Sequence, residues 1–265
     1  MLVRKKKVDR CDLATLRHYG CAWVTGAGSG IGAAISRRLV RDGWEVAGSA
    51  RNETKLGALR RELGGTFHPY PVDVREIKTV REKFATIESV HGPVSLAILN
   101  AGVYEVRGDR MFDPEAAKTM FETNVLGTIN TLGVVLDSMV EQERGQLAVM
   151  SSLAGYRGLP KSAGYCASRA ATLALAEALR EDCRAKGVKI QAITPGFVKT
   201  PMTAKNTFPM PFLIEPEVAA ERIMGGLNGN RFEITFPLRL SLLMKFVRIL
   251  PYFAYFPLVR RLVRP

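Results

Sequence analysis

The sequence predicts one α/β domain, a doubly wound parallel sheet with helices on both faces, followed by a basic and apolar C-terminal tail. Two observations support this fold class. Short β-rich runs alternate with helical stretches from residue 21 to residue 236, and such alternation is typical of a parallel sheet covered by helices. No linker and no internal repeat interrupts the alternation, so a chain of 265 residues fits one large domain.

In chain order, residues 1–18 are expected to form a basic N-terminal extension that is solvated, because they show no clear apolar period. Residues 19–236 form the predicted domain, and residues 237–265 form an amphipathic tail. The expected strands are residues 21–25, 45–50, 66–72, 96–100, 146–152, 189–196 and 231–236. The expected helices include residues 32–43, 75–90, 115–143 and 167–187.

The net charge of +13 is concentrated at the two ends of the chain. Residues 1–18 carry +4 and residues 231–265 carry +6, so the body between them is nearly neutral. Basic ends favour an anionic partner surface, either phospholipid or nucleic acid. We expect no nucleic-acid partner, because the charges are not arranged around a known binding motif.

Cysteine and histidine usage argues against disulfides and metal sites. The cysteines show no CxxC pair, which favours a reducing compartment, and the histidines are scattered without a clustered ligand set. These residues are Cys11, Cys21, Cys166, Cys183, His18, His68 and His91. The basic N-terminus is not followed by an apolar signal segment. We therefore expect a cytoplasmic protein with no bound metal.

The run TGAGSGIG, residues 25–32, follows the first expected strand and opens the first helix. Glycine lets the backbone turn sharply and approach a pyrophosphate closely. The helix N-terminus beyond it offers free N–H groups and a positive dipole end. At this place in a Rossmann-type alternation, the run indicates dinucleotide binding. The expected contacts are Gly26, Gly28, Ser29, Gly30, Ile31 and Gly32.

The end of the second expected strand favours NADP(H) over NAD(H). An acidic residue at this point would bind the adenosine ribose hydroxyls of NAD. This chain instead has Arg51 and Asn52. An arginine here can pair with a 2′-phosphate, which only NADP(H) carries.

With these features in place, the chain resembles the short-chain dehydrogenase/reductase family over residues 20–236. DV at residues 73–74 resembles the pair that contacts adenine, and NAG at residues 100–102 resembles the strand-end motif beside the cofactor. PGFVKTP at residues 195–201 resembles the turn that holds the nicotinamide carboxamide. The resemblance implies further cofactor contacts at Asp73, Val74, Asn100, Ala101, Gly102, Tyr165, Arg169, Pro195, Gly196, Val198 and Thr200.

The resemblance also implies a set of catalytic residues. Tyr165 would give or take the proton of the substrate oxygen while a hydride moves to or from the nicotinamide. Ser152, thirteen residues earlier, would hydrogen-bond the same oxygen. Asn124, within NVLG, would hold a water of the proton relay.

Arg169 departs from the family, which has a lysine four residues after the tyrosine. Tyr165 and Arg169 share one helix face, and a nearby cation favours the phenolate. Arginine is longer and planar, however, and it cannot lend a proton. The leading prediction is an NADP(H)-dependent oxidoreductase. The alternative is a non-catalytic or weakly active NADP(H)-binding protein attached to a membrane or partner.

The segment after Thr200 favours a hydrophobic alcohol or carbonyl substrate. In the family this segment covers the substrate, and here it is apolar with few charges. Its apolar residues are Met202, Phe208, Met210, Phe212 and Leu213. The alternative is that these side chains only pack the lid.

The tail cannot span a bilayer, because its longest uncharged run, Ile249 to Val259, has eleven residues where a span needs ~20. Its mixture of basic, apolar and aromatic residues favours a peripheral contact with the inner face of a membrane. The alternative is a tail folded onto the body or onto a partner subunit. The family resemblance implies a homo-oligomer packed through the helices at 113–143 and 164–186.

Overall fold

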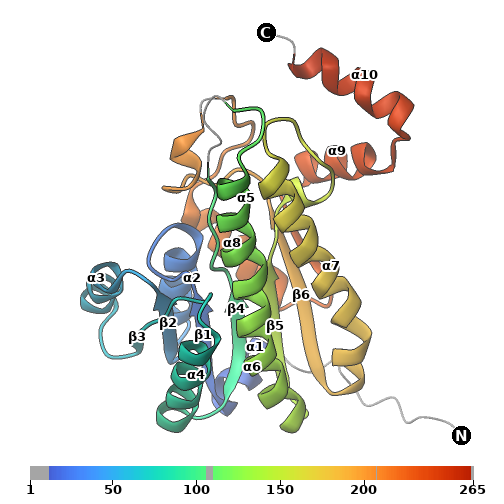
Figure 1. Ribbon diagram of the computed structural model, residues 1–265. Coiled ribbons are helices and arrows are strands. Elements are labelled where there is room, and N and C mark those ends of the chain that lie inside the picture. The colour runs from blue at the N-terminus through green and yellow to red at the C-terminus, as the bar shows by residue number, and fades with distance from the viewer. Residues whose placement is uncertain (1–11, 106–109, 207, 264–265) are drawn as a thin grey trace, which may run out of the picture.

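The computed structural model describes residues 12–105, 110–206 and 208–263. Within these residues, seven parallel strands form one sheet in the spatial order β3-β2-β1-β4-β5-β6-β7 (Figure 1). The strands are β1 (Cys21–Thr25), β2 (Val46–Ala50), β3 (Phe67–Pro71), β4 (Val94–Leu99), β5 (Gly145–Met150), β6 (Val188–Pro195) and β7 (Glu233–Phe236). Every expected strand is present, with its bounds within two residues of the expectation.

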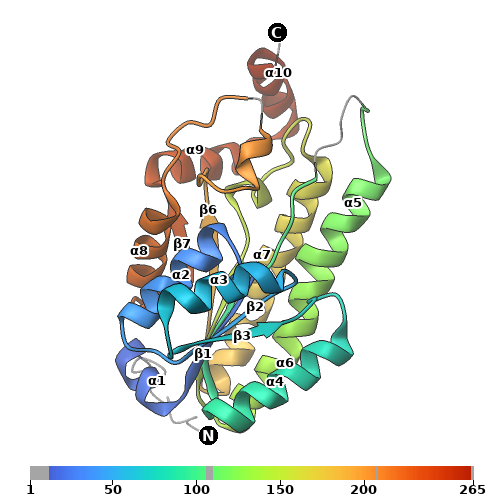
Figure 2. The ribbon, with the colours of Figure 1, turned by 90° about the vertical axis from the view of Figure 1, so that its left-hand side faces the viewer.

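The helices cover both faces of this sheet (Figure 2). One layer contains α2 (Gly30–Arg41), α3 (Glu53–Leu63) and α8 (Pro216–Leu227). The other contains α4 (Ile77–His91), α6 (Gly127–Glu141) and α7 (Ala163–Ala185). The predicted doubly wound fold is therefore confirmed.

Each face of the sheet has its own apolar core because successive strand residues point to opposite faces. In β1, Trp23 belongs to the cluster under α4, α6 and α7, and Val24 belongs to the cluster under α2 and α8. Both side chains are 0% exposed. The indole N–H of Trp23 donates to Ser49 Oγ at 2.9 Å, which satisfies the one polar group of this buried ring.

The order in which successive strands join the sheet reverses at β1, which pairs with β2 on one side and with β4 on the other. In such sheets a crevice opens outside the carboxyl ends of the strands at the switch point. Here these ends are Thr25 of β1 and Leu99 of β4, which are neighbours in the register. The residues that follow them begin the glycine-rich loop and the NAG segment.

The domain begins earlier than residue 19, which corrects the expected N-terminal extension. Helix α1 (Leu13–Tyr19) is capped by Asp12, whose Oδ1 accepts from the N–H of Thr15 at 2.7 Å. Leu13 and Leu16 are 6% and 0% exposed and join the core beneath α2. A helix this short, with only two buried residues, shows no apolar period in the sequence, so the sequence did not predict it. Residues 1–11 of the expected extension lie outside the described residues.

The long helix expected at 115–143 contains a π-helical turn. It consists of α5 (Pro114–Met120), the π turn (Phe121–Leu126) and α6. The N–H of Gly127 donates to the carbonyl of Glu122, five residues earlier. Such turns often mark functional sites, and this one contains Asn124.

The tail folds into two helices, α9 (Leu238–Ile249) and α10 (Tyr252–Val263). They follow β7 and lie at the end of the molecule where the strands have their carboxyl ends (Figures 1 and 2). Among the described helices, none has the length and apolar character needed to cross a membrane.

Candidate active site

The glycine-rich loop after β1 is held against the end of β4. The amide nitrogen of Asn100 donates to the carbonyl oxygens of Thr25, at 3.0 Å, and of Gly26, at 3.3 Å. Gly26 has a φ of +69°, and a Cβ there would lie 2.8 Å from Asn100 Nδ2. A Cβ on Gly32 would lie 2.2 Å from the carbonyl oxygen of Gly26. These two glycines are needed for the loop to close, and Gly32 does not face the cleft.

Helix α2 begins at the far side of this loop and presents its free N–H groups to the cleft. Its N-cap residue, Ser29, makes no side-chain capping hydrogen bond. Gly30 has a φ of +54°, and a Cβ there would lie 2.9 Å from Thr200 Cγ2. The loop therefore exposes backbone N–H groups at a helix N-terminus, which is the arrangement that binds phosphate.

A cleft of about 260 Å³ extends across the carboxyl ends of β1, β2 and β4. Most of the predicted cofactor-binding residues line it: Gly26, Gly28, Ser29, Gly30, Ile31, Arg51, Asn52, Asp73, Val74, Asn100, Ala101, Gly102 and Thr200. The sequence analysis missed other lining residues: Ser49, Ala50, Lys55, Val72, Val103, Thr123 and Pro201. Met202, which was expected on the substrate side, also lines the cleft. The structure thus brings together segments that follow β1, β2, β3, β4 and β6, with Thr123 from the π turn.

The N-terminus of α3 forms the wall of the cleft beyond β2. Asn52 caps this helix, because its Oδ1 accepts from the N–H of Lys55 at 2.9 Å. Arg51 and Lys55 are both exposed and both line the cleft, whereas Glu53 does not. This wall therefore carries two cations. Asn52 belongs to it as the N-cap of α3.

Asp73 is paired within the wall beyond β3. Its carboxylate accepts from the guanidinium of Arg75 at 2.6 Å and from the backbone N–H of the same residue at 3.1 Å. The Arg75 hydrogen bonds lower the pKa of Asp73, and the nearby charge of Arg51 lowers it further. Asp73 is therefore anionic at neutral pH.

Arg169 is buried beside the ring of Tyr165. Its guanidinium carbon lies 5.2 Å from the centroid of that ring, within the range of a cation–π contact. Nη1 donates to the carbonyl oxygen of Met150 at 3.1 Å, and a Cβ on Gly102 would lie 2.3 Å from Nη2. The side chain is 2% exposed. Arg169 therefore lies beside the ring of Tyr165, and the catalytic role of this pair stays a prediction.

Ser152 lies just beyond the end of β5, two residues after Met150. It is 9% exposed, and its Oγ donates to the carbonyl oxygen of Pro195 at 3.4 Å. Ser152 Oγ also accepts from the N–H of Ala154 at 3.2 Å. Arg169 thus connects the strand end that carries Ser152 to the ring of Tyr165.

Asn124 is fully buried in the π turn and joins two parts of the site. Its Nδ2 donates to the carbonyl of Val103 at 3.0 Å and to Ser168 Oγ at 3.1 Å. Its Oδ1 accepts from the N–H of Val103 at 2.7 Å. Both side-chain N–H groups are therefore used by protein atoms. The expected role of Asn124 as holder of a relay water stays a prediction.

The remaining predicted cofactor contacts do not line the cleft. Val198 is 3% exposed and forms a β-bridge with Ile214. Gly196 continues the end of β6, where its N–H donates to the carbonyl of Phe236 at 2.7 Å. The predicted roles of Pro195, Gly196 and Val198 toward a cofactor stay predictions.

A second cavity, about 50 Å³, opens beside Tyr165. Tyr104 lines it and meets Tyr165 edge-on, with ring centroids 5.3 Å apart. The other lining residues include Met111, Phe112, Met120 and Lys161. Sequence reasoning missed Tyr104, although its place two residues after the NAG motif was a usable signal.

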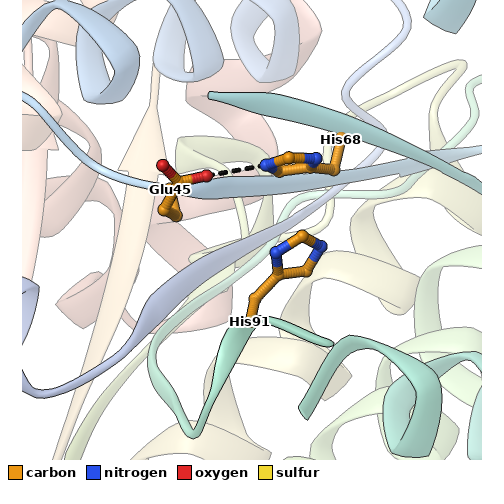
Figure 3. A group of neighbouring side chains, drawn as sticks. All are labelled: Glu45, His68 and His91. Carbon is orange, nitrogen blue, oxygen red and sulfur yellow. Dashed lines mark hydrogen bonds and ion pairs between the residues drawn. The ribbon is translucent and has the colours of Figure 1, made fainter. Parts of the chain in front are cut away.

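Two of the three histidines lie together near the start of β2 and β3, which corrects the expectation that they are scattered (Figure 3). His68 Nε2 bonds Glu45 Oε2 at 2.6 Å, and His91 Nε2 bonds the hydroxyl of Tyr70 at 2.8 Å. The two rings are tilted by 35° to each other, with centroids 4.0 Å apart. Burial, with the charge of His68, lowers the pKa of His91. One ligand atom from each of Glu45, His68 and His91 lies within 4.8 Å of the other two, so these three side chains could hold a metal ion.

The cleft fits a dinucleotide on three structural grounds. Glycines leave space where side chains would fill the loop, and α2 presents an N-terminus without a side-chain cap. Cations lie at the α3 wall. Within the described residues, Arg169 Nε is buried without a hydrogen-bond partner, but Arg169 does not line the cleft.

Comparison with known proteins agrees with this geometry. Residues 20–209 match the family model for short chain dehydrogenases. An uncharacterized oxidoreductase of Myxococcus xanthus is 38% identical over 247 residues, which are 92% of this chain and 98% of the relative.

Two solved structures illustrate the likeness. A short-chain dehydrogenase of Burkholderia cenocepacia in complex with NADP has a TM-score of 0.78 and 25% identity, over 93% of this chain and 98% of that one. The actinorhodin polyketide ketoreductase with NADPH has a TM-score of 0.76 and 26% identity, over 85% and 98%. The chain therefore belongs to the short-chain dehydrogenase/reductase family of NAD(P)-dependent oxidoreductases.

Proposed function

We propose that the protein is an NADP(H)-dependent oxidoreductase that interconverts a hydrophobic alcohol and its carbonyl compound. The observation that carries this proposal is the position of Arg169. Its guanidinium lies over Tyr165 and is bonded to the end of β5, next to Ser152. Arg169 thus contacts both the phenol ring and the strand end that leads to Ser152.

The chemistry that a bound nicotinamide cofactor supplies is hydride transfer. The protein's own residues handle the oxygen and its proton. Tyr165 donates or accepts this proton, and the positive charge of Arg169 stabilises the ring when it is ionised. Ser152 donates a hydrogen bond to the oxygen as charge develops on it. Asn124 positions the segment after NAG by bonding both polar groups of the Val103 backbone.

NADP(H) is favoured over NAD(H) by the charges at the α3 wall. Arg51 and Lys55 line the cleft there, and the acidic Glu53 does not. A 2′-phosphate gains from two cations and from the N-terminus of a capped helix. An NAD ribose would find no carboxylate on that wall to accept its hydroxyl protons.

The substrate class follows from the apolar side chains around Tyr165 and on the segment after Thr200. Met111 and Phe112 border the small cavity and are 94% and 53% exposed. Phe208 and Phe212 are 46% and 50% exposed, which favours contact with a substrate over packing of the lid alone. Side chains left open in this way suit contact with an apolar substrate.

The alternative is a non-catalytic NADP(H)-binding protein. One observation favours it: Nη1 of Arg169 is already bonded to Met150, which leaves this cation with fewer donors for a cofactor. Cofactor binding supports both functions, so turnover distinguishes them. The deciding experiment follows nicotinamide absorbance with a panel of long-chain, terpenoid and steroid alcohols and ketones. Absence of turnover across the panel, with NADPH binding intact, would favour the alternative.

We further propose a homo-oligomer that packs through the helices at 113–143 and 164–186. The π turn and α6 leave Phe121, Leu126 and Ile129 exposed by 39%, 52% and 44%, which is costly on a free surface. Light scattering of the purified protein tests this proposal, and a monomeric mass would contradict it.

A further inference from the structure

We propose that the outer side of the C-terminal helices docks on the surface of an anionic phospholipid bilayer. We call this surface the tail face. Its residues are Leu238, Leu242, Phe246, Ile249, Tyr252, Phe253 and Phe256.

Helix α9 turns its apolar stripe toward solvent. Leu238, Leu242, Phe246 and Ile249 recur at spacings of four, four and three, which places them on one side of a helix. They are 63%, 64%, 56% and 77% exposed. A helix that serves only to complete the fold would bury this stripe.

The other side of α9 contacts the body. Ser241 is 1% exposed and accepts from the hydroxyl of Thr235 at 2.9 Å. Lys245 forms an ion pair with Glu233 of β7. Leu240 and Met244 of the same helix pack against the core. Helix α9 is thus fixed to the body without the four exposed residues of its apolar stripe.

Helix α10 continues the tail face with aromatic rings. Tyr252, Phe253 and Phe256 are 67%, 82% and 52% exposed. The rings of Tyr252 and Phe256 stack, with centroids 5.6 Å apart. Exposed aromatic side chains are favoured at the boundary between lipid headgroups and acyl chains.

The charge of the tail selects an anionic lipid surface over a second copy of the chain. Residues 237–263 include five basic residues and no acidic one. A symmetric contact between two tails would bring like charges together. Anionic headgroups would instead neutralise them while the rings and aliphatic side chains enter the interface.

Arg157 holds the tail in this position. Its guanidinium carbon lies 4.6 Å from the ring centroid of Tyr252 and 4.4 Å from that of Tyr255. It also donates to the carbonyls of Arg248 and Leu250, at 3.1 and 3.2 Å. The tail face is therefore preorganised, and little order has to be imposed when it binds.

Docking would also orient the substrate opening, and this part rests on the proposed function. The tail helices and the segment after Thr200 lie at the same end of the molecule (Figures 1 and 2). Arg157 itself lies in the chain between Ser152 and Tyr165. A lipid-soluble substrate would thus reach the site from the surface on which the protein rests.

The test uses the full chain and vesicles of phosphatidylcholine, with or without phosphatidylglycerol. We expect co-sedimentation with the anionic vesicles that weakens at high salt. A Leu242→Glu, Phe246→Glu double variant should bind these vesicles at least roughly tenfold more weakly than the unaltered protein. The matched control is Val90→Glu, which changes a side chain that is 63% exposed on α4, away from the tail. It should bind like the unaltered protein.

A second readout reports insertion directly. Trp23 and Trp44 are 0% and 2% exposed, so a Phe253→Trp variant adds the one tryptophan that lipid can reach in the described residues. Its emission should shift to the blue on anionic vesicles alone. No shift, or equal binding to neutral and anionic vesicles, overturns the proposal.

The same variants separate this inference from the proposed function. NADPH binding should be unchanged in the double variant, because neither residue lines the cleft. A different result would be that the double variant has a lower oligomer mass by light scattering than the unaltered protein, and that neither protein binds vesicles. The tail face would then be a contact between copies of the chain, and the lipid proposal would be wrong.

Discussion

The guanidinium carbon of Arg169 lies 5.2 Å from the centroid of the Tyr165 ring, on the same helix and four residues away. The family has lysine at this position. Arginine keeps the positive charge beside the phenol and spreads it over a planar group bonded to the end of β5.

Replacement of Tyr165 by phenylalanine should reduce turnover by about 10² or more, because no other residue of the site can hand over the proton. Arg169→Lys should retain or raise activity, since it restores a compact cation. Arg169→Met should lose most activity, because the apolar stem remains and the charge is lost. Steady-state rates with any substrate that turns over check the three changes. Full activity in Tyr165→Phe or Arg169→Met would mean that the pair is not catalytic.

Gly102→Ala should damage the site through Arg169. The new methyl group would lie 2.3 Å from Nη2 of Arg169 and 3.0 Å from Oδ1 of Asn124. We expect a loss of about 1–3 kcal/mol in the free energy of unfolding, together with a fall in turnover. Gly57→Ala is the control, since a Cβ there meets nothing within 4 Å and alanine suits a helix. Chemical denaturation measures the unfolding free energy of both variants, and steady-state rates measure their turnover. Equal stability of the two variants would contradict the prediction.

The unaltered protein should bind NADPH more tightly than NADH. Arg51→Asp should reverse this order, because it removes a partner of the 2′-phosphate and adds repulsion. Lys55→Ala should weaken NADPH alone, by roughly 1 kcal/mol at this exposed position. Lys78→Ala, an exposed lysine of α4 outside the cleft, should change neither. Fluorescence titration measures the affinities, and equal binding of both cofactors by the unaltered protein would refute the proposed preference.

Glu233 should contribute more to stability than its partner Lys245. Its carboxylate accepts from Tyr156, from Thr194 at 2.8 Å and from Lys245, and its side chain is 18% exposed against 45% for the lysine. Glu233→Gln should cost about 1–3 kcal/mol of unfolding free energy, and Lys245→Met about 1 kcal/mol or less. Denaturant titration at neutral pH compares them, and a larger loss in the lysine variant would contradict this ranking.

The contribution of Glu233 should also depend on pH. Burial raises the pKa of its carboxyl, but the hydrogen bonds from Lys245, Tyr156 and Thr194 outweigh burial and lower it below 4.5. A carboxyl with a lowered folded pKa stabilises the protein above its unfolded pKa. This stability is lost as the pH falls through the folded pKa. The gap between the unaltered protein and Glu233→Gln should therefore narrow only in acid below 4.5.

The strands and the glycine-rich loop could be predicted from the sequence because their causes are local. A buried parallel strand is a short apolar run, and Gly26 has a backbone angle that glycine adopts freely. Helix α3 was harder to predict, since only Leu56 and Leu59 of its residues are buried. The π turn has the composition of an ordinary helix, so nothing in FETNVL indicates it.

Contacts between distant parts of the chain could not be predicted. The bonds from Arg157 to the tail join residues 91 and 93 positions apart, and the contact of Glu233 with Tyr156 joins residues 77 apart. Such relationships depend on how elements pack, which composition and spacing do not encode.

The π turn at Phe121–Leu126 changes the phase of the helix that contains it. One extra residue in a helical turn rotates everything after it by about 100° relative to an uninterrupted α-helix. The half before the turn packs on α7 beside the site, and the half after it packs on α4 over the sheet. The length of this segment is therefore constrained more strictly than its composition: deleting one residue there would direct one half of the helix away from its neighbour.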